Sequence, residues 1–210
     1  MPTSGRNLLS LLSPPAQAPE PASRTGRWSL DALAGRLAEL SGLGDTAGLT
    51  AAFALVLDAQ QQGETVAWIA PPGSTFFPVD AAENGVDLDA LVVVRAPDAA
   101  AAARSADRLA RSGAFGLLVL DLGPDADVSL PLPALARLAG LAQKHHTAIV
   151  CVTQRAGHAP SLGSLVALRG IARRERAAPD RFRCTLEVTK DKRSGPWSAE
   201  EICRGPAGLR

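Results

Sequence analysis

The sequence has few of the residues that usually carry specialised chemistry. Tyrosine is absent from its 210 residues, methionine occurs once, and Phe and Trp together make up only 4%. Alanine, leucine and valine must therefore fill most of the interior. The apolar share of 46% is enough for one packed globular domain at this length.

The sequence also has few cysteines, a small net charge and no long apolar run. Each of these features excludes a class of protein. Cys151, Cys184 and Cys203 are far apart and form no CxxC motif, so neither a disulfide framework nor a zinc site is expected. Widely spaced cysteines without a disulfide framework are typical of proteins in a reducing cytoplasm. The formal net charge of +1 predicts no partner by itself. No apolar run has the length of a membrane span, and the N-terminus lacks a signal-peptide pattern.

Residues for catalysis or metal binding are not grouped in the sequence. His145 and His146 fall at the expected end of a helix, and His158 lies in an expected loop. No Ser or Cys has neighbours that would suggest a nucleophile, and no cluster has the spacing of metal ligands. We therefore expect no catalytic residue, no metal and no cofactor.

One region departs from the even balance of charge. Residues 155–193 contain ten Lys and Arg against four Asp and Glu. Such an excess predicts either a surface for phosphate or an acidic partner, or an ordinary solvated surface. The residues singled out for partner or DNA contacts are Arg169, Arg173, Arg174, Arg176, Lys190, Lys192 and Arg193. If residues 161–176 are helical, the four arginines among them form one positive ridge; meandering strands are the alternative.

Composition divides the chain into three parts. Residues 1–28 are rich in Pro, Ala and Ser and predict a flexible arm, with an apolar stretch at 7–12 that docks on this domain or on a partner. Residues 29–200 form the expected domain, and residues 201–210 a C-terminal tail.

Within the domain, helices and strands are expected to alternate. Helical patterns cover 51–63, 77–85, 98–113 and 132–146, and apolar strand-length runs cover 64–70, 88–95, 115–123 and 147–154. Continuous Val/Ile/Leu runs between helices are typical of a parallel sheet that is covered on both faces. The more polar segments after residue 154 favour antiparallel strands. The fold class is therefore α/β, with antiparallel C-terminal strands. Leucine periodicity alone favours a helix across 29–42, although Gly35 interrupts it.

The segment GLGDTAGLT, residues 42–50, is placed like a phosphate-binding loop but lacks its chemistry. Such a loop reads GxxxxGK[ST] between a strand and a helix, with lysine on the phosphates and the hydroxyl on magnesium. If Gly42 takes the first position, Gly48 replaces the lysine and Leu49 replaces the Ser or Thr. The pocket is then expected to present neither a cation nor a coordinating hydroxyl.

These segments resemble the RecA-type core in their order and spacing. GRLAELSG resembles the strand before its phosphate loop, and QGETVAWIAP, RLARSGAFGLLVLD, AIVCVTQ and VTKDKRSGPW follow in sequence. The run from VAWIAPPG through NGVDLDALVVVR resembles most closely the ImuA family, which is RecA-like and SulA-related. The resemblance covers about residues 29–197 and implies that residues 36–41 are a strand.

Transferred to this chain, most RecA-type nucleotide contacts are lost. The acidic base after the second strand falls at Pro71 or Pro72. Asp121 matches the acidic end of the third strand, and Gln154 matches the residue that senses the γ-phosphate; we interpret both as vestigial. Lys190 and Lys192 match a lysine pair that reaches a neighbouring subunit's nucleotide. The DNA-binding loop is shortened to about residues 155–164.

The resemblance implies a non-catalytic adaptor in damage-induced (SOS) translesion DNA synthesis. Its partners would be an ImuB-like polymerase-related subunit and RecA, with DNA less favoured because few aromatic residues accompany the basic ones. Two alternatives remain: a diverged RecA-type ATPase that takes its cation from elsewhere, and a DNA-binding recombination regulator. The expected location is the cytoplasm, at the nucleoid when engaged.

Overall fold

The computed structural model describes residues 27–44, 46–72, 74 and 76–204. The predicted arm, including the apolar stretch at 7–12, lies almost entirely outside the described residues. Near the start of the described residues, the indole Nε1 of Trp28 donates to the Ala51 carbonyl at 3.0 Å. This bond ties the start of the domain to the helix that follows the loop.

The described part of the chain forms thirteen elements, and the first ten alternate between helix and strand. In order they are α1 (Leu30–Leu33), β1 (Leu37–Ser41), α2 (Gly48–Gln61), β2 (Val66–Ala70), α3 (Pro78–Glu83), β3 (Leu91–Arg95), α4 (Ala99–Ser112), β4 (Leu117–Asp121), α5 (Leu132–His145), β5 (Ala148–Thr153), β6 (Leu168–Ala178), β7 (Arg181–Asp191) and β8 (Trp197–Arg204).

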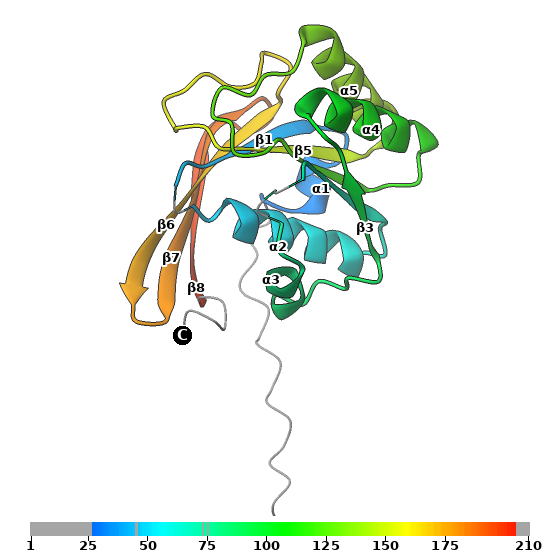
Figure 1. The fold of residues 1–210 in the computed structure, drawn as a ribbon. Coiled ribbons are helices and arrows are strands. Elements are labelled where there is room, and N and C mark those ends of the chain that lie inside the picture. Colours follow the sequence, from blue (N-terminus) through cyan, green and yellow to red (C-terminus); the bar gives the residue numbers. More distant parts are fainter. Residues whose placement is uncertain (1–26, 45, 73, 75, 205–210) are drawn as a thin grey trace, which may run out of the picture.

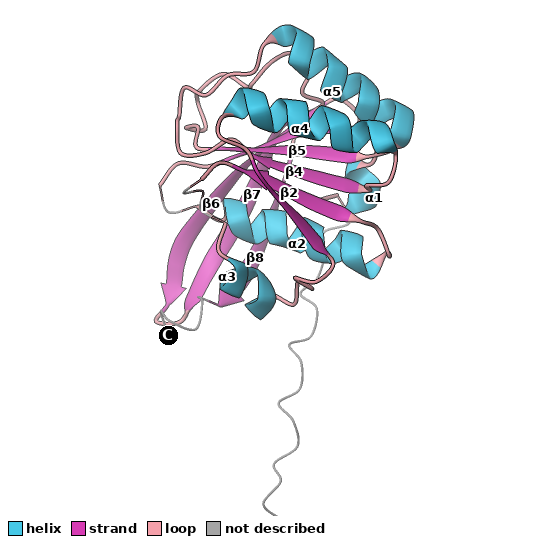
Figure 2. Cartoon of the chain, turned by 45° about the vertical axis from the view of Figure 1, so that its right-hand side comes forward, coloured by secondary structure: helices cyan, strands magenta, loops and turns pink. Residues whose placement is uncertain are grey.

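A single eight-stranded sheet runs through the molecule in the order β3-β2-β4-β5-β1-β6-β7-β8. The pairings from β3 to β6 are parallel, and β6-β7-β8 are antiparallel. This confirms the predicted α/β class with antiparallel C-terminal strands. Helices α4 and α5 cover one face of the parallel part, and α2 and α3 cover the other (Figures 1 and 2).

Each face of the sheet has its own hydrophobic core. On the α2 side, Phe53, Trp68 and Phe76 form an aromatic cluster with ring centroids 5.1 to 6.1 Å apart. On the α4 and α5 side the core is made mainly of alanine and leucine. The few aromatic residues are therefore concentrated on the face that carries α2.

Local signals explain the ends of the helices. The Asp98 carboxylate accepts from the Ala101 amide at 2.6 Å and caps the start of α4, and Gly113 closes it with φ 68°. Ser29 caps α1, which ends after four residues, so the periodicity that favoured one helix over 29–42 is wrong beyond Leu33. The chain then enters β1, as the resemblance implied.

Two further expectations differ from the structure. The strand expected at 88–95 is not buried, because β3 lies at the edge of the sheet and leaves Val92 and Val93 about two-fifths exposed. In addition, β8 continues through Arg204 and pairs with β7, so regular structure extends past the expected boundary at residue 200.

Candidate functional site: a closed phosphate loop and two basic clusters

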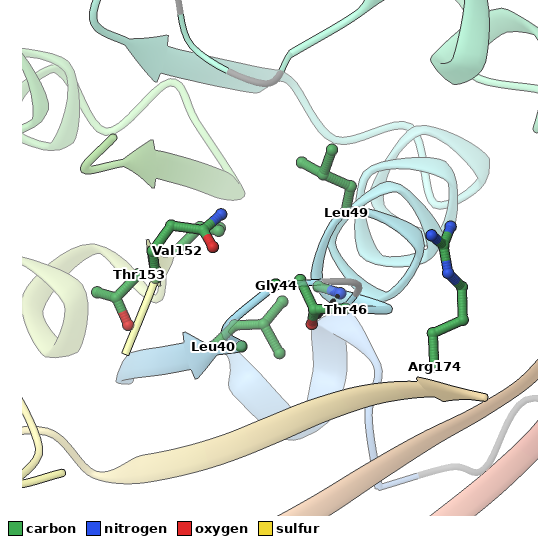
Figure 3. Close-up of a pocket in the computed structure, with 10 residues that line it drawn as sticks. Leu40, Gly44, Thr46, Leu49, Val152, Thr153 and Arg174 are labelled. Carbon is green, nitrogen blue, oxygen red and sulfur yellow. Dashed lines mark hydrogen bonds between the residues drawn. The ribbon is translucent and has the colours of Figure 1, made fainter. Parts of the chain in front are cut away.

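The carboxyl ends of the central strands meet at one edge of the sheet, where the sequence predicts the degenerate loop. Strands β4, β5 and β1 are parallel neighbours, so the segments that follow them lie side by side. A cavity of about 200 Å³ opens there (Figure 3). Its lining residues are Leu40, Gly42, Gly44, Thr46, Gly48, Leu49, Val152, Thr153, Gln154 and Arg174.

The loop after β1 is filled by one of its own side chains. The Thr46 hydroxyl accepts a hydrogen bond from the Gly48 amide (3.1 Å) and donates one to the Ala172 carbonyl (2.8 Å). A Cβ atom on Gly42 would lie only 2.0 Å from that hydroxyl oxygen, so glycine is required there. In a working phosphate loop, such amides face the phosphate. Here the Gly48 amide is already satisfied, and a phosphate would have to displace Thr46.

The start of α2 lacks the two side chains that a triphosphate requires. Gly48 is the first residue of the helix and Leu49 the second, in the positions of the lysine and the magnesium-binding hydroxyl. Leu49 packs against the core on this face of the sheet. Both residues line the cavity, so the structure puts the predicted loop residues where the sequence pattern indicates.

The expectation of a cavity without a cation is wrong. Arg174 reaches it from β6, and Figure 3 shows the side chain rising from that strand toward α2. The guanidinium carbon lies 4.9 Å from the centroid of the Phe182 ring. Two hydroxyls, those of Thr46 and Thr153, also line the cavity, but neither stands at the magnesium-ligand position, which is Leu49. The Thr153 hydroxyl is within 3.2 Å of Ser41 Oγ and donates to Glu39 at 3.4 Å.

Asp121 is the last residue of β4 and Gln154 directly follows β5, so both lie at the carboxyl ends of the strands. Of the two, only Gln154 lines the cavity. Asp121 is buried, and its Oδ1 accepts from the Gly123 amide at 2.9 Å. Burial raises the pKa of the Asp121 carboxyl, while the Gly123 hydrogen bond and the charge of Arg95 lower it. Its Oδ2 has no hydrogen-bond partner among the described residues. Asp121 therefore caps its own loop.

The shortened loop after β5 is held firmly by buried charges. Glu39, fully buried in β1, accepts from the Ser161 hydroxyl (2.6 Å) and the Leu162 amide (2.9 Å). Arg169 donates to the carbonyls of Ala156 and Ala159, and its Nε lies 3.8 Å from the Glu39 carboxylate. Arg155 donates to the Pro160 and Val128 carbonyls.

Glu39 is the residue that the sequence analysis missed. A lone carboxylate in an apolar strand, LAELS, is the signal that could have revealed it, because such a group needs buried partners. The sequence analysis also did not predict that Thr46 and Arg174 line this cavity, although it singled out Arg174 for partner or DNA contacts. Both positions depend on contacts with distant segments.

The helical ridge of arginines is not formed, because residues 168–178 are a strand. Arg169 is 7% exposed and serves the loop, so it is not a partner-binding residue. Arg173 and Arg174 are adjacent in the strand and point to opposite faces. Arg173 lies 3.3 Å from Glu187, and Arg176 donates to the Pro179 carbonyl at 2.9 Å.

The second basic group consists of Lys190, Lys192 and Arg193. It lies at the amino ends of the parallel strands, opposite to the loop after β1. β7 runs antiparallel to β6, so its end lies beside the starts of β6 and β1. Lys190 and Lys192 both donate to the Ser164 carbonyl, at 3.4 and 2.9 Å. Lys192 and Arg193 line a second cavity, of about 280 Å³. The structure thus separates these residues from the loop after β1.

The described residues hold neither a metal-binding cluster nor a membrane-spanning helix. In that part of the chain, no group of three or more His, Cys, Asp or Glu side chains is placed to hold a metal ion. None of the described helices has the length and apolar character to cross a membrane.

Sequence comparison identifies the relatives of this fold. No family model matches the chain. It is 31% identical over 137 residues to "Protein RecA" of Fusobacterium nucleatum, covering 57% of this chain and 36% of that protein. The chain is therefore similar to RecA over little more than half of its own length. The RecA of Rhodospirillum rubrum matches at 31% over 137 residues, or 57% of this chain and 37% of that protein. The RecA of Teredinibacter turnerae matches at 32% over 119 residues, or 51% and 34%.

These RecA-like matches agree with the fold. The chain spans little more than a third of the length of the RecA proteins it matches. The eight-stranded sheet, parallel from β3 to β6 and flanked by helices, is consistent with a RecA-like α/β core.

Proposed function

We propose that this chain is a non-catalytic RecA-like adaptor, similar to ImuA, that binds an ImuB-like polymerase-related subunit and RecA during damage-induced translesion synthesis. The observation that carries the proposal is the closed loop, in which Thr46 bonds the Gly48 amide and the Ala172 carbonyl. A RecA-like core whose phosphate loop is occupied by its own side chain keeps its surfaces but loses the need for nucleotide. That combination suits a protein that works by contact.

The energetics support the absence of catalysis. Phosphoryl transfer depends on positioning and on charge stabilisation, and each direct stabiliser is typically worth about 3 kcal/mol. The lysine and magnesium positions are Gly48 and Leu49, and prolines follow β2 where a base is required. Binding would also cost the two hydrogen bonds of Thr46, about 1 kcal/mol each.

Isothermal titration with ATP and Mg²⁺ tests this part of the proposal. We expect no heat of binding at micromolar to low millimolar nucleotide for the wild type. Thr46→Ala, which empties the loop, is expected to remain without micromolar affinity because the lysine is still missing. Micromolar binding by the wild type would overturn the non-catalytic assignment.

A diverged RecA-type ATPase is the second candidate, and the presence of Arg174 in the cavity favours it. In this case Arg174 replaces the missing lysine, with Gln154 at the same edge. It predicts micromolar ATP binding that is lost in Arg174→Ala or Asp121→Ala. Retention of binding in both variants would contradict this mechanism.

Co-purification tests the partners. The tagged chain is expected to retain an ImuB-like protein, and RecA, when each is co-expressed with it. If the chain retained neither protein, the proposed adaptor role would be overturned. The DNA-binding alternative predicts affinity for DNA that falls steeply with salt and is lost in the triple variant R173A/R174A/R176A; a flat salt dependence would remove it.

A further inference from the structure

The second cavity lies far from the phosphate loop and has a different character. It opens at the start of β1, at the edge of the sheet opposite to the loop after β1. Apolar atoms of Leu37, Ala139 and Leu165 contribute to its walls, and Gln143 adds an amide. Lys192 and Arg193 line it as well, together with Gly35, Arg36 and Ala167. An open, largely apolar cavity bordered by cations is suited to a ligand with both apolar and anionic groups.

The positive charge here is not neutralised by neighbouring carboxylates. Asp191 lies between the basic residues, but Arg36 binds its carboxylate in a buried ion pair. Lys190 and Lys192 share a single acceptor, the Ser164 carbonyl. Among the described residues, neither lysine nor Arg193 has a carboxylate within ion-pair distance.

Repulsion between these groups supports this description. Burial and the charges of Lys192 and Arg169 lower the pKa of the Lys190 ammonium, and the charge of Glu39 offsets this only in part. An incoming anion would relieve this repulsion, so it gains more here than at an isolated lysine. Three other arginines in residues 155–193 do have carboxylate partners: Arg173 pairs with Glu187, Arg183 with Glu200, and Arg169 with Glu39.

We infer that this cavity, lined by Lys192 and Arg193 and with Lys190 beside Lys192, is the docking site for an acidic segment of a partner protein. The segment places an aliphatic side chain against Leu37, Ala139 and Leu165, and its carboxylates meet the three cations. The inference rests on the proposed adaptor function and specifies the surface that the adaptor uses.

A peptide fits the observations better than nucleic acid does. A phosphate backbone needs a run of cations spaced along a groove. Here three cations are clustered at one cavity, and the adjoining strands carry acid–base pairs such as Arg173 with Glu187. The apolar wall has no counterpart on a phosphate backbone, whereas it matches an aliphatic side chain next to Asp or Glu.

Fluorescence anisotropy with a labelled eight-residue peptide, Gly-Asp-Glu-Leu-Asp-Glu-Leu-Gly, tests the site on the full chain. We expect saturable binding that weakens in 0.5 M NaCl, and no binding of the same peptide with Asn and Gln in place of Asp and Glu. The double variant K192E/R193E should weaken binding at least tenfold, which corresponds to about 1.4 kcal/mol. Ala139→Leu, which narrows the cavity without changing charge, should also weaken it.

The matched control is R104E/R108E, which makes the same change in net charge on the exposed side of α4. It should bind the peptide like the wild type. No binding to the wild type, or equal binding by K192E/R193E, would overturn the inference. Tighter binding of a dT20 oligonucleotide that displaces the peptide and is lost in K192E/R193E would overturn the inference and assign the site to DNA. Peptide binding without retention of an ImuB-like protein would leave the site standing and reject only the proposed partner.

Discussion

At the scale of single residues, a few polar side chains inside the protein decide what the loop and strand ends can do. Thr46 occupies the loop after β1 and ties it to β6. Asp121 sits buried at the end of β4 and bonds its own loop. Both residues are engaged with backbone atoms of the chain, where a nucleotide-binding protein would present groups to phosphate and magnesium.

The buried carboxyl of Asp121 should leave a signature in the dependence of stability on pH. Its pKa is raised by burial, so between the unfolded value, about 4, and the higher folded value the folded state binds more protons. Its contribution to stability therefore falls as pH rises through that window. We expect any advantage of the wild type over Asp121→Asn in urea unfolding to shrink or reverse between pH 4 and pH 7.

Asp125→Asn, which changes an exposed carboxylate, is the control and should show no such trend. A wild-type advantage that grows with pH would mean that the Asp121 carboxylate is stabilised when charged. Such a result would favour a bound cation and the ATPase alternative.

At the scale of elements, the formation of strand β6 decides which basic side chains of this segment are buried and which are exposed. A helix would have placed four arginines on one side, whereas the strand directs alternate residues to opposite faces. Arg169 thereby joins Glu39 inside the protein and holds the loop at 155–166, while Arg173 stays on the surface. The same composition therefore yields one structural arginine and several exposed ones.

Substitution of these two arginines separates the roles. Arg169→Ala should lower the free energy of unfolding by about 3 kcal/mol, because it leaves Glu39 buried beside an empty site and frees the loop. Arg173→Ala should change it by no more than about 1 kcal/mol, because its pair with Glu187 is exposed. Urea unfolding monitored by circular dichroism measures both. Equal effects would contradict the assigned roles.

At the scale of the whole molecule, one continuous sheet connects the parallel core with the antiparallel strands. The loop after β1 lies at the carboxyl ends of the parallel strands, and the basic cavity lies at their amino ends. This separation means that, under the proposed function, docking at the basic cavity does not depend on nucleotide at the loop.

The last strand should be part of the cooperative unit. Residues 201–204 pair with β7, and Cys203 packs against the core on the α2 side. Truncation after Glu200 should therefore lower the free energy of unfolding by about 2 kcal/mol, through lost ladder hydrogen bonds. Truncation after Arg204 is the control and should have less effect. Indistinguishable midpoints in urea would place residues 201–204 outside the folded unit.

The sequence was sufficient to predict the layered core because the signals for its helices and strands are local. Apolar runs, capping residues and glycines predict most of the helices and strands within a few residues, and the missing lysine is legible in one short loop. The periodicity failed over 29–42 because a four-residue helix and a buried strand share leucines, and it could not show that β3 is an edge strand.

By itself, then, the sequence determined the alternating elements, the parallel core and the loss of phosphate-binding groups at Gly48 and Leu49. Only the tertiary structure decided that β6 lies beside β1, which brings Arg174 to the cavity, closes the loop on Ala172 and places Arg169 near Glu39. It also decided that Lys190, Lys192 and Arg193 gather at the opposite edge. The physical reason is that periodicity reports the environment of each segment, whereas strand order and register between distant segments are settled by packing of the whole sheet.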